Sequence, residues 1–293
     1  MDRRLFIVSA LAVSAAASGA WAQSGFRSDR ISARVRGRGG RDVVFIPGLA
    51  STSDVWTRTA ERIDDRCRVH LIDIRGFGGL EPGANAEGPV SGAVSREIGR
   101  YIREAGLARP ALVGHSLGGQ MAIRTAADQG SGVERLMVVD SAPFFPALIH
   151  AAATVGDVEP IARIAYQAVL FLGEEALREQ AGGMGVRLGG AADAVFQTLG
   201  WQGGHRRLIA QALYEVLTTD LRHRLPEVAA ETTVVYGSTR DADAPRRDFG
   251  RMLRPTFASL PEPARFVPIE GAEHMVMIDR PSAFNAAVDR FLA

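Results

Sequence analysis

A serine in a glycine-rich turn is the residue of this chain best suited to nucleophilic chemistry. Ser116 lies within Gly114-His115-Ser116-Leu117-Gly118, directly after an apolar run over residues 110–113. A sharp turn from strand to helix lifts a serine hydroxyl out of a sheet, and glycines on either side avoid a collision across the bend. The helix that begins beside the serine aims free backbone N–H groups at developing negative charge. The pattern predicts that Ser116 is a nucleophile.

A serine nucleophile needs a base to accept its proton. Of the six histidines, His274 is the best placed, because it follows a predicted strand within the loop 270–275. His115 adjoins Ser116, but neighbouring side chains on so tight a turn point apart. His70 falls within a predicted strand and is expected to be a core or surface residue. We therefore expect His274 to be the base.

A carboxylate must hold the histidine so that one ring nitrogen faces the serine. Asp241 is the first choice, because it comes first after the turn that follows the predicted strand 232–236. Asp243 is the second choice, and Asp140, at the end of the preceding strand, is the third. All three follow strand ends, and the sequence leaves the choice among them open.

Two backbone N–H groups are expected to stabilise the oxyanion that forms during acyl transfer. One belongs to Leu117, directly after the nucleophile, and the other to Leu49, directly after Pro47-Gly48. Only the position of their backbone matters for this role.

The composition is that of an ordinary globular protein of 293 residues, with 46% hydrophobic and 23% charged residues and a net charge of +1. No long basic stretch suggests a nucleic-acid partner. The single cysteine, Cys67, excludes an intramolecular disulfide and is expected to be a buried, inert thiol. No HExxH or clustered ligand pattern predicts a metal site, and we expect no cofactor. The sequence does not indicate an oligomeric state.

The first 22 residues resemble an export signal. A charged start with Arg3-Arg4 precedes an apolar run from residue 5 to about residue 20, and Ala20-Trp21-Ala22 matches an A-x-A cleavage site. The twin arginine partly matches the motif of the export route for folded proteins. We expect cleavage before Gln23, no membrane anchor afterwards, and a bacterial periplasmic or secreted protein.

Strands and helices alternate along most of the remaining chain. Apolar strands are predicted near residues 42–46, 69–72, 110–113, 134–140, 232–236 and 264–269, and the alternating residues 31–36 predict an edge strand. Helices are predicted near residues 90–106, 246–260 and 281–291. Apolar strands that alternate with helices predict an α/β fold with a mostly parallel sheet covered on both faces, and the site at the carboxyl ends of the strands.

The alternation stops between residues 143 and 220, where the composition becomes apolar and helical. We interpret residues 143–220 as an inserted helical cap. Residues 23–142 and 221–293 then form the core.

The order and spacing of these motifs resemble the α/β-hydrolase superfamily, specifically its serine esterase-like branch with a helical cap. The resemblance rests on residues 45–49, 73–78, 114–119, 236–241 and 271–274, and it covers nearly the whole chain after the export signal. It implies an eight-stranded, mostly parallel sheet and a Ser-Asp-His triad. Pro47-Gly48 stands where His-Gly is commoner, and Asp241 follows Gly237 by one residue more than usual. Serine at position 116 argues against the dehalogenase and epoxide-hydrolase branches, whose nucleophile is a carboxylate.

The function predicted from these features is that of an exported serine hydrolase. A carboxylesterase that cleaves small to medium hydrophobic esters fits best. A lactonase, an acyltransferase, a C–C bond hydrolase or a cofactor-free perhydrolase would use the same three residues. A non-catalytic binding protein on the same fold is the alternative from another class.

Overall fold

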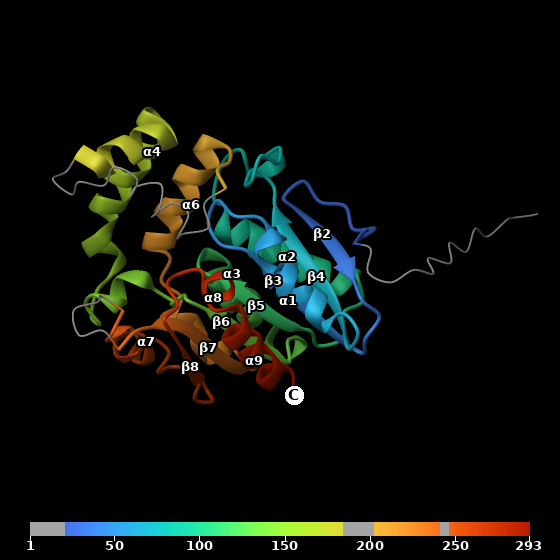
Figure 1. The fold of residues 1–293 in the computed structure, drawn as a ribbon. Coiled ribbons are helices and arrows are strands. Elements are labelled where there is room, and N and C mark those ends of the chain that lie inside the picture. The colour runs from blue at the N-terminus through green and yellow to red at the C-terminus, as the bar shows by residue number, and fades with distance from the viewer. Residues whose placement is uncertain (1–20, 184–201, 241–245) are drawn as a thin grey trace, which may run out of the picture.

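The computed structural model describes residues 21–183, 202–240 and 246–293. Its centre is an eight-stranded sheet with the strand order β1-β2-β4-β3-β5-β6-β7-β8 (Figure 1). The pairs β1–β2 and β2–β4 are antiparallel, and all other neighbouring strands are parallel. The strands are β1 (Ala22–Gln23), β2 (Ile31–Arg36), β3 (Arg41–Ile46), β4 (Cys67–Ile74), β5 (Ala111–His115), β6 (Arg135–Val139), β7 (Glu231–Ser238) and β8 (Arg265–Glu270). The predicted α/β class and the mostly parallel sheet are confirmed.

Helices cover both faces of this sheet. They are α1 (Thr57–Ile63), α2 (Ser91–Glu104), α3 (Leu117–Gln129), α4 (Val155–Gly183), α6 (Arg206–Thr218), α7 (Phe249–Thr256), α8 (Val276–Asp279) and α9 (Pro281–Leu292). Short 3-10 helices are η1 (Ser53–Trp56), η2 (Gly83–Asn85), η3 (Gly130–Gly132), η4 (Phe145–Leu148) and η5 (Arg222–Glu227). The helix predicted over residues 246–260 is shorter in the structure, and Arg246 precedes it.

The apolar strands are buried on both faces, because successive side chains of a strand point to opposite sides. In β3, Val44 and Ile46 belong to the apolar core on one face of the sheet, which also contains residues of α2, α3 and α7. Val43 and Phe45 belong to the core on the other face, with residues of α1, α8 and α9. A strand with one polar face could not separate two apolar cores in this way.

The antiparallel end of the sheet differs from the prediction for residues 31–36. These residues form β2, as expected, but β2 is not an edge strand, because β1 pairs with it through Ala22 and Val35. The Trp21 ring lies 5.6 Å from the Arg34 guanidinium carbon and 5.5 Å from that of Arg36. The expected cleavage point before Gln23 therefore falls within a paired strand. No described helix is both long and apolar enough to span a membrane.

Two polar residues expected within or near the core are buried. The His70 ring bonds the Tyr101 hydroxyl at 2.6 Å and a carboxylate oxygen of Asp42 at 3.0 Å, so this histidine is a satisfied core residue. Burial raises the pKa of Tyr101 to about 12. Cys67 is buried, and burial raises the pKa of its thiol, which agrees with an inert cysteine.

The long insertion between β6 and β7 is helical where the structure describes it. It includes η4, α4 and α6, and the two α-helices lie side by side, apart from the sheet (Figure 1). Residues 184–201 of the predicted cap lie outside the described residues. The buried carboxylate of Glu215 on α6 accepts the N–H groups of Val90 and Ser91 at 2.8 and 2.6 Å, where α2 begins. This contact joins the insertion to the core.

Candidate active site

Ser116 lies on a sharp turn between β5 and α3, as the sequence predicts. Its backbone has φ 52° and ψ −122°, a conformation that L-residues rarely adopt. A Cβ added at Gly114 would lie 2.2 Å from the carbonyl oxygen of Gly118, and one added at Gly118 would lie 2.3 Å from that of Pro47. Both glycines are therefore required by close backbone approach. The surrounding packing imposes a strained geometry on Ser116.

The loop after β3 lies against this turn. A Cβ added at Gly48 would come within 3.2 Å of the Ser116 Cβ, so the backbone leading to Leu49 passes beside the serine. Leu117 is the first residue of α3. Within the described part of the chain, no backbone carbonyl accepts the N–H of Leu49 or of Leu117. Both N–H groups expected for the oxyanion thus lie next to Ser116 and are free to bind a ligand oxygen.

His274 lies in the loop between β8 and α8. Its Nδ1 is 2.6 Å from Oδ2 of Asp140, the residue that follows β6. The histidine side chain is 15% exposed and the Asp140 side chain only 1%. A carboxylate on Nδ1 fixes the ring orientation and leaves Nε2 as the nitrogen available for proton exchange.

The structure therefore supplies the carboxylate at His274 from β6, whereas the sequence analysis favoured Asp241 after β7 and placed Asp140 third. Asp241 and Asp243 lie outside the described residues. The physical reason lies in the sheet: β6 and β7 are adjacent, and Asp140 donates its N–H to Val235 in β7. The carboxyl ends of β6 and β7 lie next to each other, so an aspartate that follows either strand begins close to the same place. The sequence alone therefore does not determine which aspartate contacts the histidine.

An arginine that the sequence analysis did not single out binds the same carboxylate. Arg246 donates from its two terminal nitrogens to Oδ1 and Oδ2 of Asp140, each at 2.8 Å. The Gly237 N–H adds a bond to Oδ1 at 3.0 Å. Arg246 also pairs with Glu273 at 3.1 Å. No sequence pattern marks this arginine, since it reaches Asp140 only through the tertiary fold.

These contacts determine the ionisation of Asp140. Burial alone would raise the pKa of the carboxyl group, but hydrogen bonds from His274 and Arg246, and the charges of both, lower it to about 2. Asp140 is thus held as an anion that accepts four hydrogen bonds from three residues. A bidentate guanidinium adds orientation as well as charge.

We predict that this carboxylate makes the protein more sensitive to acid. The pKa is about 2 in the folded state and 3.8 ordinarily, so the contribution to stability is complete above pH 4 and is lost as the pH falls toward 2. The shift corresponds to about 2 kcal/mol at neutral pH. Arg246→Met raises the folded pKa and should move the acid-unfolding midpoint to higher pH, as measured by circular dichroism. An unchanged midpoint would contradict this.

His115 also supports the site, which the sequence analysis did not foresee. Its Nε2 donates to the backbone carbonyl of His274 at 2.9 Å, and the two ring centroids are 4.5 Å apart. Burial above all, and also the charge of His274, lowers the pKa of His115 to about 3. The ring is therefore neutral and fixes the loop that carries His274.

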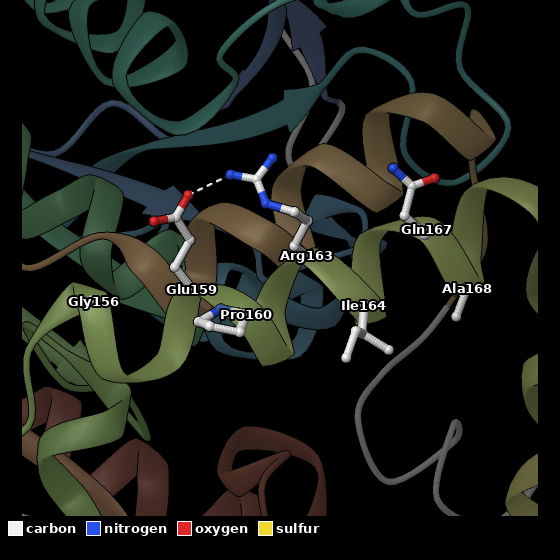
Figure 2. A pocket seen from close by; sticks show the side chains of 7 residues that line it. All are labelled: Gly156, Glu159, Pro160, Arg163, Ile164, Gln167 and Ala168. Atoms are coloured by element: carbon white, nitrogen blue, oxygen red, sulfur yellow. Dashed lines mark hydrogen bonds and ion pairs between the residues drawn. The ribbon is translucent and has the colours of Figure 1, made fainter.

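A groove lies away from these residues. Among the described residues, the lining of this groove of about 870 Å³ comes from α4 and includes Ile164, Ala168 and the ion pair Glu159–Arg163 (Figure 2). It takes no lining from the strand ends that carry Ser116 and Asp140. Among the described residues, no three histidine, cysteine or acidic side chains are grouped to hold a metal ion.

Comparisons with known proteins agree with this architecture. The model of the alpha/beta hydrolase family matches residues 43–287. N-formylmaleamate deformylase of Pseudomonas putida is 32% identical over 101 residues, which are 34% of this chain and 37% of that protein. The chain thus spans well under half the length of the first curated relatives it matches. A longer match, 26% identical over 266 residues, covers 87% of this chain and 94% of the pimeloyl-[acyl-carrier protein] methyl ester esterase of Edwardsiella ictaluri.

Solved structures share the fold at low sequence identity. A thermophilic esterase from Thermogutta terrifontis superposes with a TM-score of 0.68 at 19% identity, covering 94% of this chain and 98% of that one. The enol-lactonase from Burkholderia xenovorans gives a TM-score of 0.64 at 19% identity, covering 89% and 96%.

Proposed function

Because the chain belongs to the alpha/beta hydrolase family, we propose that it is a serine hydrolase and, more specifically, a carboxylesterase. The observation that carries the proposal is the geometry at the strand ends: Ser116 on a strained turn, and His274 held at Nδ1 by the buried Asp140. In this proposal Ser116 is the nucleophile, His274 the base and Asp140 the carboxylate that orients the base.

The proposed reaction has two halves. Ser116 Oγ attacks the ester carbonyl carbon while its proton moves to Nε2 of His274, and the carbonyl oxygen becomes an oxyanion bound by the N–H groups of Leu49 and Leu117. The C–O bond to the alcohol breaks, and His274 returns the proton to that alcohol. Water then attacks the acyl-enzyme with the same proton transfers and releases the acid and free Ser116.

Two observations support an ester with a hydrophobic part. The relative from Edwardsiella ictaluri, whose match covers most of both chains, is a methyl ester esterase by name. Helix α4 exposes large apolar side chains: Ile161 is 66% exposed, Ile164 70% and Phe171 75%. Exposed apolar residues gathered on one helix are typical of a surface that meets an apolar ligand.

We further propose that the protein is exported to the periplasm or beyond. The charged start, the apolar run to about residue 20 and Ala20-Trp21-Ala22 support this proposal. Mass spectrometry of the protein recovered from the periplasm of a bacterial host would give the N-terminus. A start at Gln23 supports the proposal, and full-length protein retained in the cytoplasm contradicts it.

The same three side chains also permit hydrolysis of lactones or amides. The matched deformylase and the enol-lactonase give a reason to include such substrates in a test. We expect p-nitrophenyl esters of short to medium acyl chains to be cleaved faster than long-chain esters, lactones and N-formyl amides. The measurement is kcat/KM across this panel, together with labelling of Ser116 by a fluorophosphonate. Labelling with turnover of lactones alone would favour a lactonase. Absence of both turnover and labelling would favour a binding protein.

A further inference from the structure

The end of the helical insertion is bonded to the loop that carries Leu49. The Gln202 N–H donates to the carbonyl oxygen of Ala50 at 2.6 Å. The side-chain Oε1 of Gln202 accepts the N–H of Thr52 at 2.9 Å. One residue from the insertion therefore holds the loop on both sides of Ser51. The bond between Thr52 and Gln202 joins residues that are 150 positions apart in the chain.

The loop needs such support because its backbone is strained. Ala50 has φ 52°, in the left-handed region that residues with a Cβ rarely adopt. Strained backbone persists only where the surrounding contacts fix it. Ala50 directly follows Leu49, so a rotation about its backbone would change the direction of the peptide groups beside Ser116.

Gln202 is itself held in place by the contacts of the residues that follow it. The next residues bond a different loop of the core: Gly78 donates to Gly203 at 2.9 Å, and His205 donates to Gly76 at 2.7 Å. A Cβ added at Gly204 would lie 2.2 Å from the carbonyl oxygen of Gly76, so glycine permits this close approach. Residues 203–205 thus fix the backbone from which Gln202 reaches the loop.

We propose that Gln202 is a positioning residue that holds the Leu49 N–H in the orientation needed to bind the oxyanion, and so couples the helical insertion to the chemical step. The inference rests on the proposed function, in which Leu49 is an oxyanion donor. Gln202 acts through Ala50 and Thr52 and does not touch the reacting atoms. Its contribution should therefore appear in the transition state and not in substrate binding.

The test compares two substitutions of Gln202 in the whole protein. Gln202→Met keeps the length of the side chain but removes the acceptor for Thr52, whereas Gln202→Glu keeps an acceptor oxygen at the same reach. Gln202→Met should lower kcat about tenfold and leave KM within about twofold, because only the loop geometry changes. Gln202→Glu should retain kcat within about threefold. The rate of Ser116 labelling by a fluorophosphonate should fall in parallel with kcat.

Each contrary result has a distinct meaning. A raised KM with unchanged kcat would make Gln202 a substrate contact and overturn its proposed role as a positioning residue. Equal loss in both variants, or no loss in Gln202→Met, would also overturn it. If the wild type labels at Ser116 but cleaves no ester of the panel, the labelling rates alone decide. If Ser116 is not labelled in the wild type, the proposed function is wrong, and the positioning role of Gln202, which rests on it, is wrong as well.

Discussion

Ser116→Ala should reduce kcat for ester hydrolysis by a factor on the order of 10⁶ and leave the fold intact. The loss is large because the nucleophile is removed outright, so that only the oxyanion donors and substrate binding remain to accelerate attack by water. The backbone bonds of residue 116, to Val139 and from Ser141, survive in alanine. The measurement is the steady-state rate on the best ester of the panel.

The control for this variant is its thermal unfolding. Alanine meets about the same strain as serine at φ 52°, so the midpoint temperature should match that of the wild type. Fluorophosphonate labelling should be absent. A variant that retains more than a tenth of the wild-type kcat would show that Ser116 is not the nucleophile.

Asp140→Asn should lower kcat about 10⁴-fold, whereas Asp241→Asn and Asp243→Asn should each leave kcat within about threefold of the wild type. An asparagine at position 140 keeps the shape of the side chain but loses the anion that orients His274 through Nδ1. The substitution also leaves the Arg246 guanidinium, 17% exposed, without its bidentate partner. We therefore expect a loss of stability in addition to the loss of rate.

The two losses can be separated. In the double variant Asp140→Asn/Arg246→Met the guanidinium that lost its bidentate partner is also removed, and only the exposed Glu273 loses an ion pair. Part of the thermal stability should therefore return while kcat stays low. Rates are compared well below the unfolding midpoint of each variant. A large loss in Asp241→Asn together with full activity in Asp140→Asn would assign the carboxylate to the loop after β7 and refute the present choice.

Much of the fold follows from local pattern. The continuous apolar runs of β3, β5 and β7 have no polar face, and such strands are stable only between two apolar layers. In α2, the apolar residues at helical spacing are all buried: Val94, Ile98, Tyr101 and Ile102. The sequence does not predict β1, because a two-residue strand has no periodicity and its pairing with β2 depends on the tertiary fold. Because no pattern marks β1, the alternation in residues 31–36 predicts an edge strand.

The candidate site was predictable only in part. The glycines around Ser116 mark the turn, because their close approaches leave no room for a Cβ. The partners of that turn carry no such mark. Asp140 and Asp241 both follow a strand end, and the contacts of Arg246 and Gln202 join segments far apart in the chain. Contacts between segments so far apart depend on how the whole molecule packs, and no characteristic residue spacing in the sequence marks them.

The neutral ring of His115 restricts the path of the proton that would leave Ser116 in the proposed mechanism. Two imidazoles lie 4.5 Å apart, and a second basic ring beside the serine would offer a competing destination. His115 has a pKa of about 3, and its Nδ1 lacks a hydrogen-bond partner among the described residues. Burial disfavours the protonated, charged form of this ring, so His115 is a poor acceptor for the proton. In the proposed mechanism His274 is therefore the acceptor rather than His115, and transfer of a single proton is expected to dominate the solvent isotope effect on acylation.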